Sequence, residues 1–98
     1  MEYIFLNPLT YNAMFYFYVL QSLMDKDLYF GYTENLKRRF KEHKAGQVIA
    51  TRRRLPLRLV YYEAYNSEKD ARNRERQIKR RSKAHISLKC RIINSLYK

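Results

Sequence analysis

The sequence predicts an α+β domain in which a small three-stranded antiparallel sheet is flanked by about three helices. Two aromatic, β-branched segments separated by a short polar turn indicate a hairpin. Apolar residues at helical spacing follow, interrupted by one further strand, so that the order of elements is ββαβαα. The length of 98 residues fits one domain with a modest core.

The first half of the chain predicts the hairpin and a helix. Residues Met14–Leu23 and Leu28–Tyr32 are rich in Phe, Tyr, Val and Leu, which favours strands. Thr33 is the expected N-cap of a helix over Glu34–Ala45. We expect this helix to end at Gly46, because glycine readily adopts the left-handed conformation that follows many helices.

The second half predicts one strand and two helices. A basic loop, Gln47–Pro56, leads into the strand Leu57–Tyr65. A helix capped by Ser67 is expected to run to Arg81, and a last helix spans Lys83–Leu96. On that last helix the apolar residues at helical spacing predict a stripe that faces the core: Ile86, Cys90, Ile93 and Tyr97.

The composition indicates a nucleic-acid partner. Lys and Arg number 21 against 9 Asp and Glu, a net charge of +12. This imbalance opposes folding by self-repulsion and is typical of proteins that bind polyanions. Ten Tyr and five Phe accompany the cations, and such mixtures suit bases and phosphates.

Cysteine usage and hydropathy exclude other classes. The single cysteine, Cys90, excludes an internal disulfide or a multi-cysteine zinc site, and we expect a cytoplasmic protein. The apolar run Ala13–Leu20 is too short to cross a bilayer. Residues 1–13 are poorly patterned and lack the basic start of a signal peptide, so we interpret them as an extension of a domain over residues 14–98.

The first predicted helix has polar side chains where apolar ones are expected. At about 100° per residue, Arg39 and His43 fall on the same face as Leu36 and Phe40. Burying a guanidinium group without a partner is costly. A carboxylate or a bound anion is therefore expected beside Arg39.

Glu75 is the equivalent polar residue on the second predicted helix. It shares one face with Ala71 and Ile78. It could pair with Lys79 one turn further along, pair with Arg39 across the interior, or belong to a functional site. Geometry alone leaves these alternatives open.

The two hairpin strands add a pair of tyrosines and a glycine. Since side chains alternate along a strand, Tyr18 and Tyr29 can converge where the strands lie side by side. Gly31 is one of two glycines in the chain, and a glycine inside a strand often marks the close approach of another group.

These residues carry a resemblance to the GIY-YIG endonuclease domain over about residues 14–80. The chain is most similar to the small single-domain bacterial members that are related to the nuclease domain of the bacterial excision-repair nuclease. The sequences YFY at 16–18 and YFG at 29–31 match the two signatures. The ten-residue step from Tyr29 to Arg39, the four-residue step to His43 and the later Glu75 match the family order.

The resemblance implies a nuclease that hydrolyses a phosphodiester bond with one divalent ion, Mg²⁺ or Mn²⁺. By position, Glu75 would bind the metal and Arg39 would hold the scissile phosphate. Tyr18 and Tyr29 would position or deprotonate the attacking water, with His43 in support. Which tyrosine acts as the base is left open. A lone carboxylate is consistent with magnesium, which keeps several water ligands.

DNA is the expected partner, and it is expected to contact basic side chains of the two helices and the loop: Arg38, Arg52, Arg53, Arg54, Arg72, Arg76, Lys79 and Arg80. Repair or recombination is the expected setting. The alternative is a non-catalytic module for DNA or RNA that keeps the fold. Two departures from the family favour it: Tyr16 replaces the leading glycine of the first signature, and Tyr32 replaces a lysine of some relatives. A basic ribosome-associated protein is a third reading.

Overall fold

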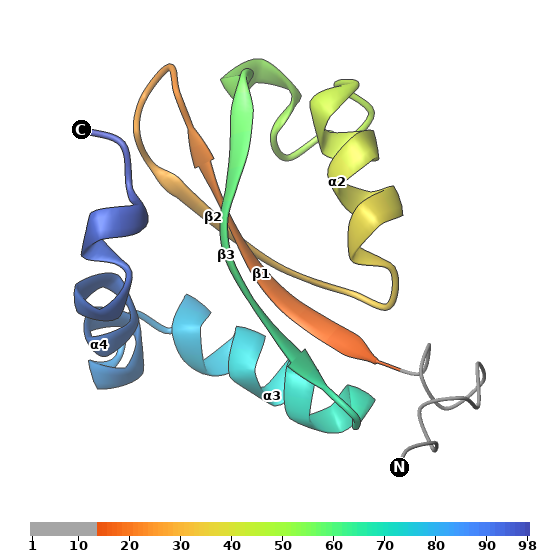
Figure 1. Ribbon diagram of the computed structural model, residues 1–98, viewed down its shortest axis with the longest axis vertical. Helices are drawn as coiled ribbons and strands as arrows, with labels where there is room; N and C mark the ends of the chain where they lie inside the picture. The colour runs from red at the N-terminus through yellow and green to blue at the C-terminus, as the bar shows by residue number, and fades with distance from the viewer. Residues whose placement is uncertain (1–13) are drawn as a thin grey trace, which may run out of the picture.

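A computed structural model describes residues 14–98, and the expected extension at residues 1–13 lies outside the described residues. The strands are β1 (Phe15–Ser22), β2 (Leu28–Thr33) and β3 (Leu57–Tyr65). The helices are α2 (Leu36–Lys44), α3 (Glu68–Lys79) and α4 (Lys83–Arg91), with 3₁₀ turns η2 (Arg52–Arg54) and η3 (Ile93–Ser95). This order and the antiparallel sheet confirm the predicted α+β class (Figure 1).

The sheet has the order β2-β1-β3, so β1 is its central strand. Successive side chains of β1 point to opposite faces of the sheet. Phe17 and Val19 face the side covered by α3 and α4, and Tyr18 and Leu20 face the side covered by α2. Figure 1 shows α2 on one side of the strands and the two later helices on the other.

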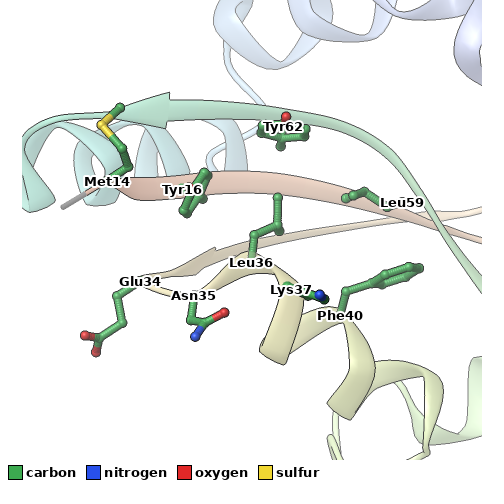
Figure 2. Close-up of a pocket in the computed structure, with 9 residues that line it drawn as sticks. All are labelled: Met14, Tyr16, Glu34, Asn35, Leu36, Lys37, Phe40, Leu59 and Tyr62. Atoms are coloured by element: carbon green, nitrogen blue, oxygen red, sulfur yellow. The ribbon is translucent and has the colours of Figure 1, made fainter. Parts of the chain in front are cut away.

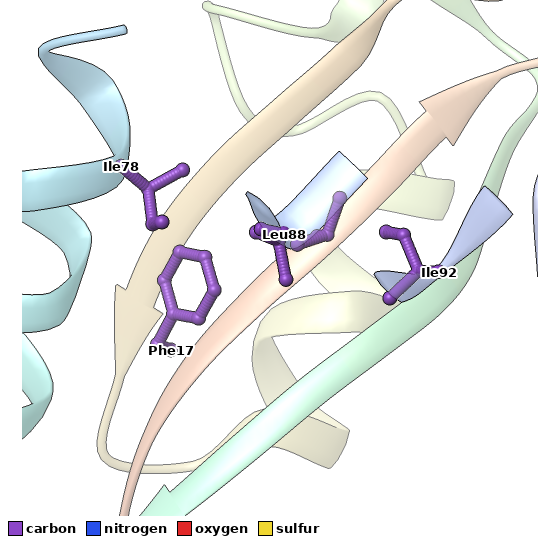
Figure 3. Close-up of a cluster of buried hydrophobic side chains, with 5 residues drawn as sticks. Phe17, Ile78, Leu88 and Ile92 are labelled. Atoms are coloured by element: carbon purple, nitrogen blue, oxygen red, sulfur yellow. The ribbon is translucent and has the colours of Figure 1, made fainter. Parts of the chain in front are cut away.

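Each face of the sheet has its own cluster of buried side chains. The cluster under α3 and α4 is wholly apolar and consists of Phe17, Val19, Ile78, Leu88 and Ile92 (Figure 3). Full burial of each such side chain stabilises the fold by about 1.5–3 kcal/mol. The cluster under α2 contains Tyr18, Leu20 and Leu57, so on this face a phenol takes part in packing.

The first helix begins two residues later than predicted. Thr33 pairs with Tyr16 and ends β2, so it is not the N-cap. Asn35 is the N-cap instead, and its Oδ1 accepts a hydrogen bond from the Arg38 amide at 3.0 Å. Gly46 follows the helix with φ 75°, which confirms the predicted end.

The second helix is capped as predicted. Ser67 is the N-cap, and its Oγ accepts a hydrogen bond from the Asp70 amide at 3.3 Å. The helix ends at Lys79 rather than Arg81, because Arg81 is in the left-handed region with φ 57°. This residue turns the chain into α4.

The predicted apolar stripe on the last helix is wrong. Ile86, Cys90, Ile93 and Tyr97 are exposed. His85, Leu88 and Ile92 are buried instead, and the His85 Nδ1–H donates to the Ile78 carbonyl at 3.0 Å. Helix α4 also ends at Arg91, so the predicted periodicity does not extend to residue 96. Within residues 14–98, none of the helices has the length and apolar character needed to cross a bilayer.

Candidate active site

The hairpin register brings the two tyrosines of the signatures together, as predicted. Tyr18 lies opposite Gly31, and Tyr29 lies opposite Leu20, so both phenols project from the same face of the sheet. Their ring centroids are 6.4 Å apart. The Tyr18 ring passes directly over Gly31, where any Cβ atom would overlap it. The glycine therefore permits the close approach that the sequence indicated.

His43 joins this pair from α2 and is fully buried. Its Nε2 lies 2.9 Å from the Tyr18 hydroxyl, and its ring stands edge-on to the Tyr29 ring at 5.2 Å between centroids. The other nitrogen, Nδ1, lies 2.8 Å from Thr51 Oγ1. Both imidazole nitrogens are therefore held by hydroxyl groups. No pattern in the sequence marks Thr51, which reaches the site from the basic loop.

Burial dominates the protonation behaviour of this pair. It lowers the pKa of His43 to about 4, and the Arg39 charge acts in the same direction. Burial also raises the pKa of Tyr18 to about 12, aided by Tyr29 and opposed by Arg39. At neutral pH the imidazole and the Tyr18 phenol are therefore both uncharged.

Arg39 has the carboxylate partner that its position required. Its Nη1 pairs with Glu42 Oε1 at 2.9 Å, on the same helix. Its side chain remains 36% exposed, and it lies close enough to the Tyr18 phenol to lower the pKa of that group. No ion pair joins Arg39 to Glu75 in the part of the chain that the structure describes. The guanidinium is thus held beside the phenols and is still accessible to an anion.

Glu75 makes the local pair that was one of the alternatives. Its Oε2 lies 2.9 Å from the Lys79 ammonium, one turn further along α3. Its charge also contributes to raising the pKa of Tyr18, although burial has the larger effect. Since α3 packs against β2, the edge strand, a carboxylate on α3 can act on a phenol that lies over that strand. The ion pair and a place near the phenols are compatible.

Arg74 orients the helix that carries Glu75. Its guanidinium binds Glu63 of β3 through both Nε, at 3.0 Å, and Nη2, at 3.1 Å. Glu63 also accepts hydrogen bonds from the hydroxyls of Tyr61 and Tyr65. A forked pair of this kind, only partly exposed, restricts the rotation of α3 about its axis. Arg74 is therefore a structural residue beside the candidate site.

The donor set fits a hydrated divalent ion better than a multi-ligand metal centre. Among residues 14–98 no group of three or more His, Cys, Asp and Glu side chains is placed to bind one ion. Glu75 is a single carboxylate, and its side chain is 19% exposed. Magnesium binds through one or two carboxylates and retains water ligands. Glu75 is therefore suited to holding such an ion together with a phosphate oxygen.

Seven of the eight basic residues predicted to contact nucleic acid are exposed, and Arg54 is the exception. Arg54 Nε pairs with Asp25 Oδ2 at 3.2 Å and ties η2 to the hairpin turn. Arg72 pairs with Glu68 and lies over the Tyr32 ring, 4.2 Å from its centroid. Exposed pairs are weak, so most of these cations stay available to a polyanion.

A buried hairpin with two phenols, a histidine held at both nitrogens, and an arginine and a glutamate within electrostatic range define a protein of the GIY-YIG class. The chain belongs to the GIY-YIG family, since the model of the GIY-YIG catalytic domain matches residues 14–88. This confirms the resemblance seen in the sequence. The family is of the nuclease type, its nucleases generally use divalent metals, and it implies a nucleic-acid substrate.

Two bacterial relatives are similar over most of the chain. A UPF0213 protein of Pediococcus pentosaceus is 42% identical over 71 residues, which cover 71% of this chain and 74% of the relative. A UPF0213 protein of Streptococcus pyogenes serotype M3 is 46% identical over 67 residues, or 67% of this chain and 72% of the relative. No solved structure matches the chain.

The buried histidine predicts an acid-sensitive fold. In the folded protein the pKa of His43 is about 4, below its ordinary value of 6.5. Between these values the unfolded chain binds a proton that the folded chain does not. The free energy of unfolding is therefore expected to be highest above pH 6.5 and to fall toward pH 4, by up to ~1.4 kcal/mol per pH unit from this group.

Urea unfolding of wild type and His43→Gln at pH 7 and pH 5 measures this effect. The variant is expected to be less stable at pH 7 but to lose less stability on acidification, because glutamine does not titrate. Equal losses in the two proteins would show that His43 does not contribute to the acid dependence.

Proposed function

We propose that this protein is a divalent-metal-dependent endonuclease that hydrolyses phosphodiester bonds in DNA, in repair or recombination. The observation that supports it best is the convergence of Tyr18, Tyr29 and His43 beside an accessible Arg39, with Glu75 within electrostatic range. The net charge of +12 supports a polyanionic substrate.

Arg39 and Glu75 divide the binding of the reacting group. The exposed side of the Arg39 guanidinium binds the scissile phosphate and offsets the charge that develops on it. Glu75 holds one Mg²⁺ or Mn²⁺ ion, exchanging its contact with Lys79 for the metal. When bound, such an ion supplies charge stabilisation and orients the reactants.

The two phenols have different tasks. A pKa of about 12 makes Tyr18 a poor base at neutral pH, and its hydroxyl is already engaged by His43. We therefore assign to Tyr18 the positioning of the attacking water, with His43 as the residue that fixes its hydroxyl. Tyr29 is then the phenol that accepts the proton of the water.

DNA lies across the exposed basic side chains of α2, η2 and α3. Arg52 and Arg53 extend from the loop that precedes β3, and both are exposed. Arg54 contributes least, because it is engaged with Asp25. Contacts of this kind position the backbone without reading sequence, so we expect little sequence specificity.

Cleavage of plasmid and branched DNA tests the proposed function. Wild type is expected to cut in Mg²⁺ and to be inactive in EDTA. Arg39→Ala is expected to lower the cleavage rate by about 100- to 1,000-fold, as does loss of a charge-stabilising donor elsewhere. Lys41→Ala, an exposed cation of the same helix, is the matched control and should cut like wild type.

Two outcomes would contradict the proposal. If wild type binds DNA in a salt-sensitive way but shows no Mg²⁺-dependent cleavage, the chain is a non-catalytic binding module. If Arg39→Ala and Lys41→Ala cut equally well, the role assigned to Arg39 is wrong.

A further inference from the structure

A groove of about 680 Å³ lies between α2 and the sheet and opens to solvent (Figure 2). Its volume is within the range of about 300–1,000 Å³ that is usual for sites of small organic groups. None of the proposed catalytic residues lines it. Helix α2 nevertheless joins the two places, because Phe40 lines the groove while its neighbour Arg39 belongs to the candidate active site.

The wall of the groove is aromatic. Tyr16 and Tyr62 meet edge to face, with their ring centroids 6.0 Å apart. Tyr62 is 52% exposed, which is a large exposure for an aromatic ring on a small domain. Tyr62 also lies opposite Tyr18 in the pairing of β1 with β3. Exposed rings beside a polyanion-binding surface are the platforms on which bases stack.

The rim of the groove is polar and favours an uncharged occupant with donors and acceptors. Glu34 and Asn35 lie there, at the start of α2 (Figure 2). A carboxylate repels phosphate but accepts a hydrogen bond from an exocyclic amine of a base. The Asn35 oxygen caps α2, so its amide NH₂ is the part that can donate to a ligand. Lys37, also at the groove, supplies a charge for the adjoining phosphate.

We propose that this groove binds one unstacked nucleobase of the DNA strand. The inference rests on the proposed function only in taking nucleic acid as the ligand. In a continuous duplex the bases are stacked and paired, and taking one out costs free energy that an unpaired nucleotide does not pay. The preferred substrates are therefore single strands, bulges, flaps and branch points rather than intact duplex.

Binding measured in EDTA tests this inference without any cleavage. The probes are a fluorescein-labelled single-stranded oligonucleotide, a fully paired duplex of equal length, and a duplex with one bulged 2-aminopurine. Wild type is expected to prefer the single strand and the bulge by about five-fold or more and to quench the 2-aminopurine emission by stacking.

Variants of Tyr62 identify the groove as the cause. Tyr62→Ala is expected to weaken binding of the single strand by about five-fold or more and to abolish the quenching, with little change for the duplex. Tyr62→Phe keeps the ring and should bind like wild type. Glu34→Ala is a second groove variant that should also lose the preference. Tyr97→Ala replaces an exposed tyrosine outside the groove and should not change it.

Three results would overturn the inference. One is an unchanged preference in both Tyr62→Ala and Glu34→Ala. Another is quenching that survives in Tyr62→Ala. The third is a dimer that Tyr62→Ala converts to a monomer in sedimentation while DNA binding stays the same, which would make the groove an interface between copies. Because EDTA is present, absence of nuclease activity contradicts the proposed function without deciding the fate of the groove.

Discussion

Glu75→Ala is expected to abolish metal-dependent cleavage while leaving the fold and the DNA affinity close to those of wild type. Glu75 is the one carboxylate proposed to hold the ion, so its loss removes the metal from the reaction. We expect the cleavage rate to fall by at least about 1,000-fold, which corresponds to about 4 kcal/mol of transition-state stabilisation. The fold should survive, because the pair with Lys79 that is lost is a partly exposed contact.

Glu68→Ala is the matched control for this experiment. Glu68 lies on the same helix and pairs with Arg72 at the same four-residue spacing, but it is exposed and lies at the other end of α3. Cleavage rates, thermal unfolding and Mn²⁺ binding by electron paramagnetic resonance are measured for both variants. Mn²⁺ binding should be lost only in Glu75→Ala. Cleavage by Glu75→Ala within about three-fold of wild type would show that the metal is held elsewhere.

Gly31→Ala is expected to both destabilise the protein and inactivate it. A Cβ atom at this position would overlap the buried Tyr18 ring, and the ring is held in place by His43. Overpacking of this kind costs about 1–3 kcal/mol. For a domain of this size each kcal/mol lowers the melting temperature by about 4–8 °C. The displaced phenol would also leave its place beside Arg39, so activity should fall further than stability.

Gly46→Ala separates the two effects. Gly46 has φ 75°, so alanine is strained there, but the space around its Cα is open and the residue lies outside the candidate site. This variant should lose stability and keep the cleavage rate of wild type below its melting temperature. Gly31→Ala with unchanged activity would mean that the position of the Tyr18 ring does not matter for catalysis.

Short-range rules explain which parts of the site could be predicted. The alternation of side chains along two paired strands is enough to bring Tyr18 and Tyr29 together. The helical repeat is enough to turn His43 toward the same face. These relations depend only on local geometry and on one hairpin, so the sequence contains them.

Other parts of the site depend on contacts that no local pattern encodes. The sequence showed that Arg39 needed a partner but could not identify Glu42, because a flexible guanidinium can fold back along its own helix. Thr51 reaches His43 from a loop without any regular repeat. The place of Glu75 relative to the phenols depends on how α3 docks, and this in turn depends on the pair of Arg74 with Glu63.

The wrong stripe on α4 has a different cause. Two sets of residues on this helix both have helical spacing: Ile86, Cys90 and Ile93 in one, and His85, Leu88 and Ile92 in the other. Periodicity alone does not choose between them. The second set is buried because His85 can donate to the exposed carbonyl at the end of α3 while its ring packs against Phe30. Tertiary packing therefore selected the less apolar set.

The alternation of β1 assigns separate tasks to its neighbouring residues. Phe17 and Val19 serve only the apolar cluster under α3 and α4, whereas Tyr18 belongs to the face of the phenols. A designer could therefore raise thermostability by repacking the first face without altering the reactive groups on the second. Natural variation should follow the same division, with volume conserved at the odd-numbered positions and chemical identity conserved at position 18.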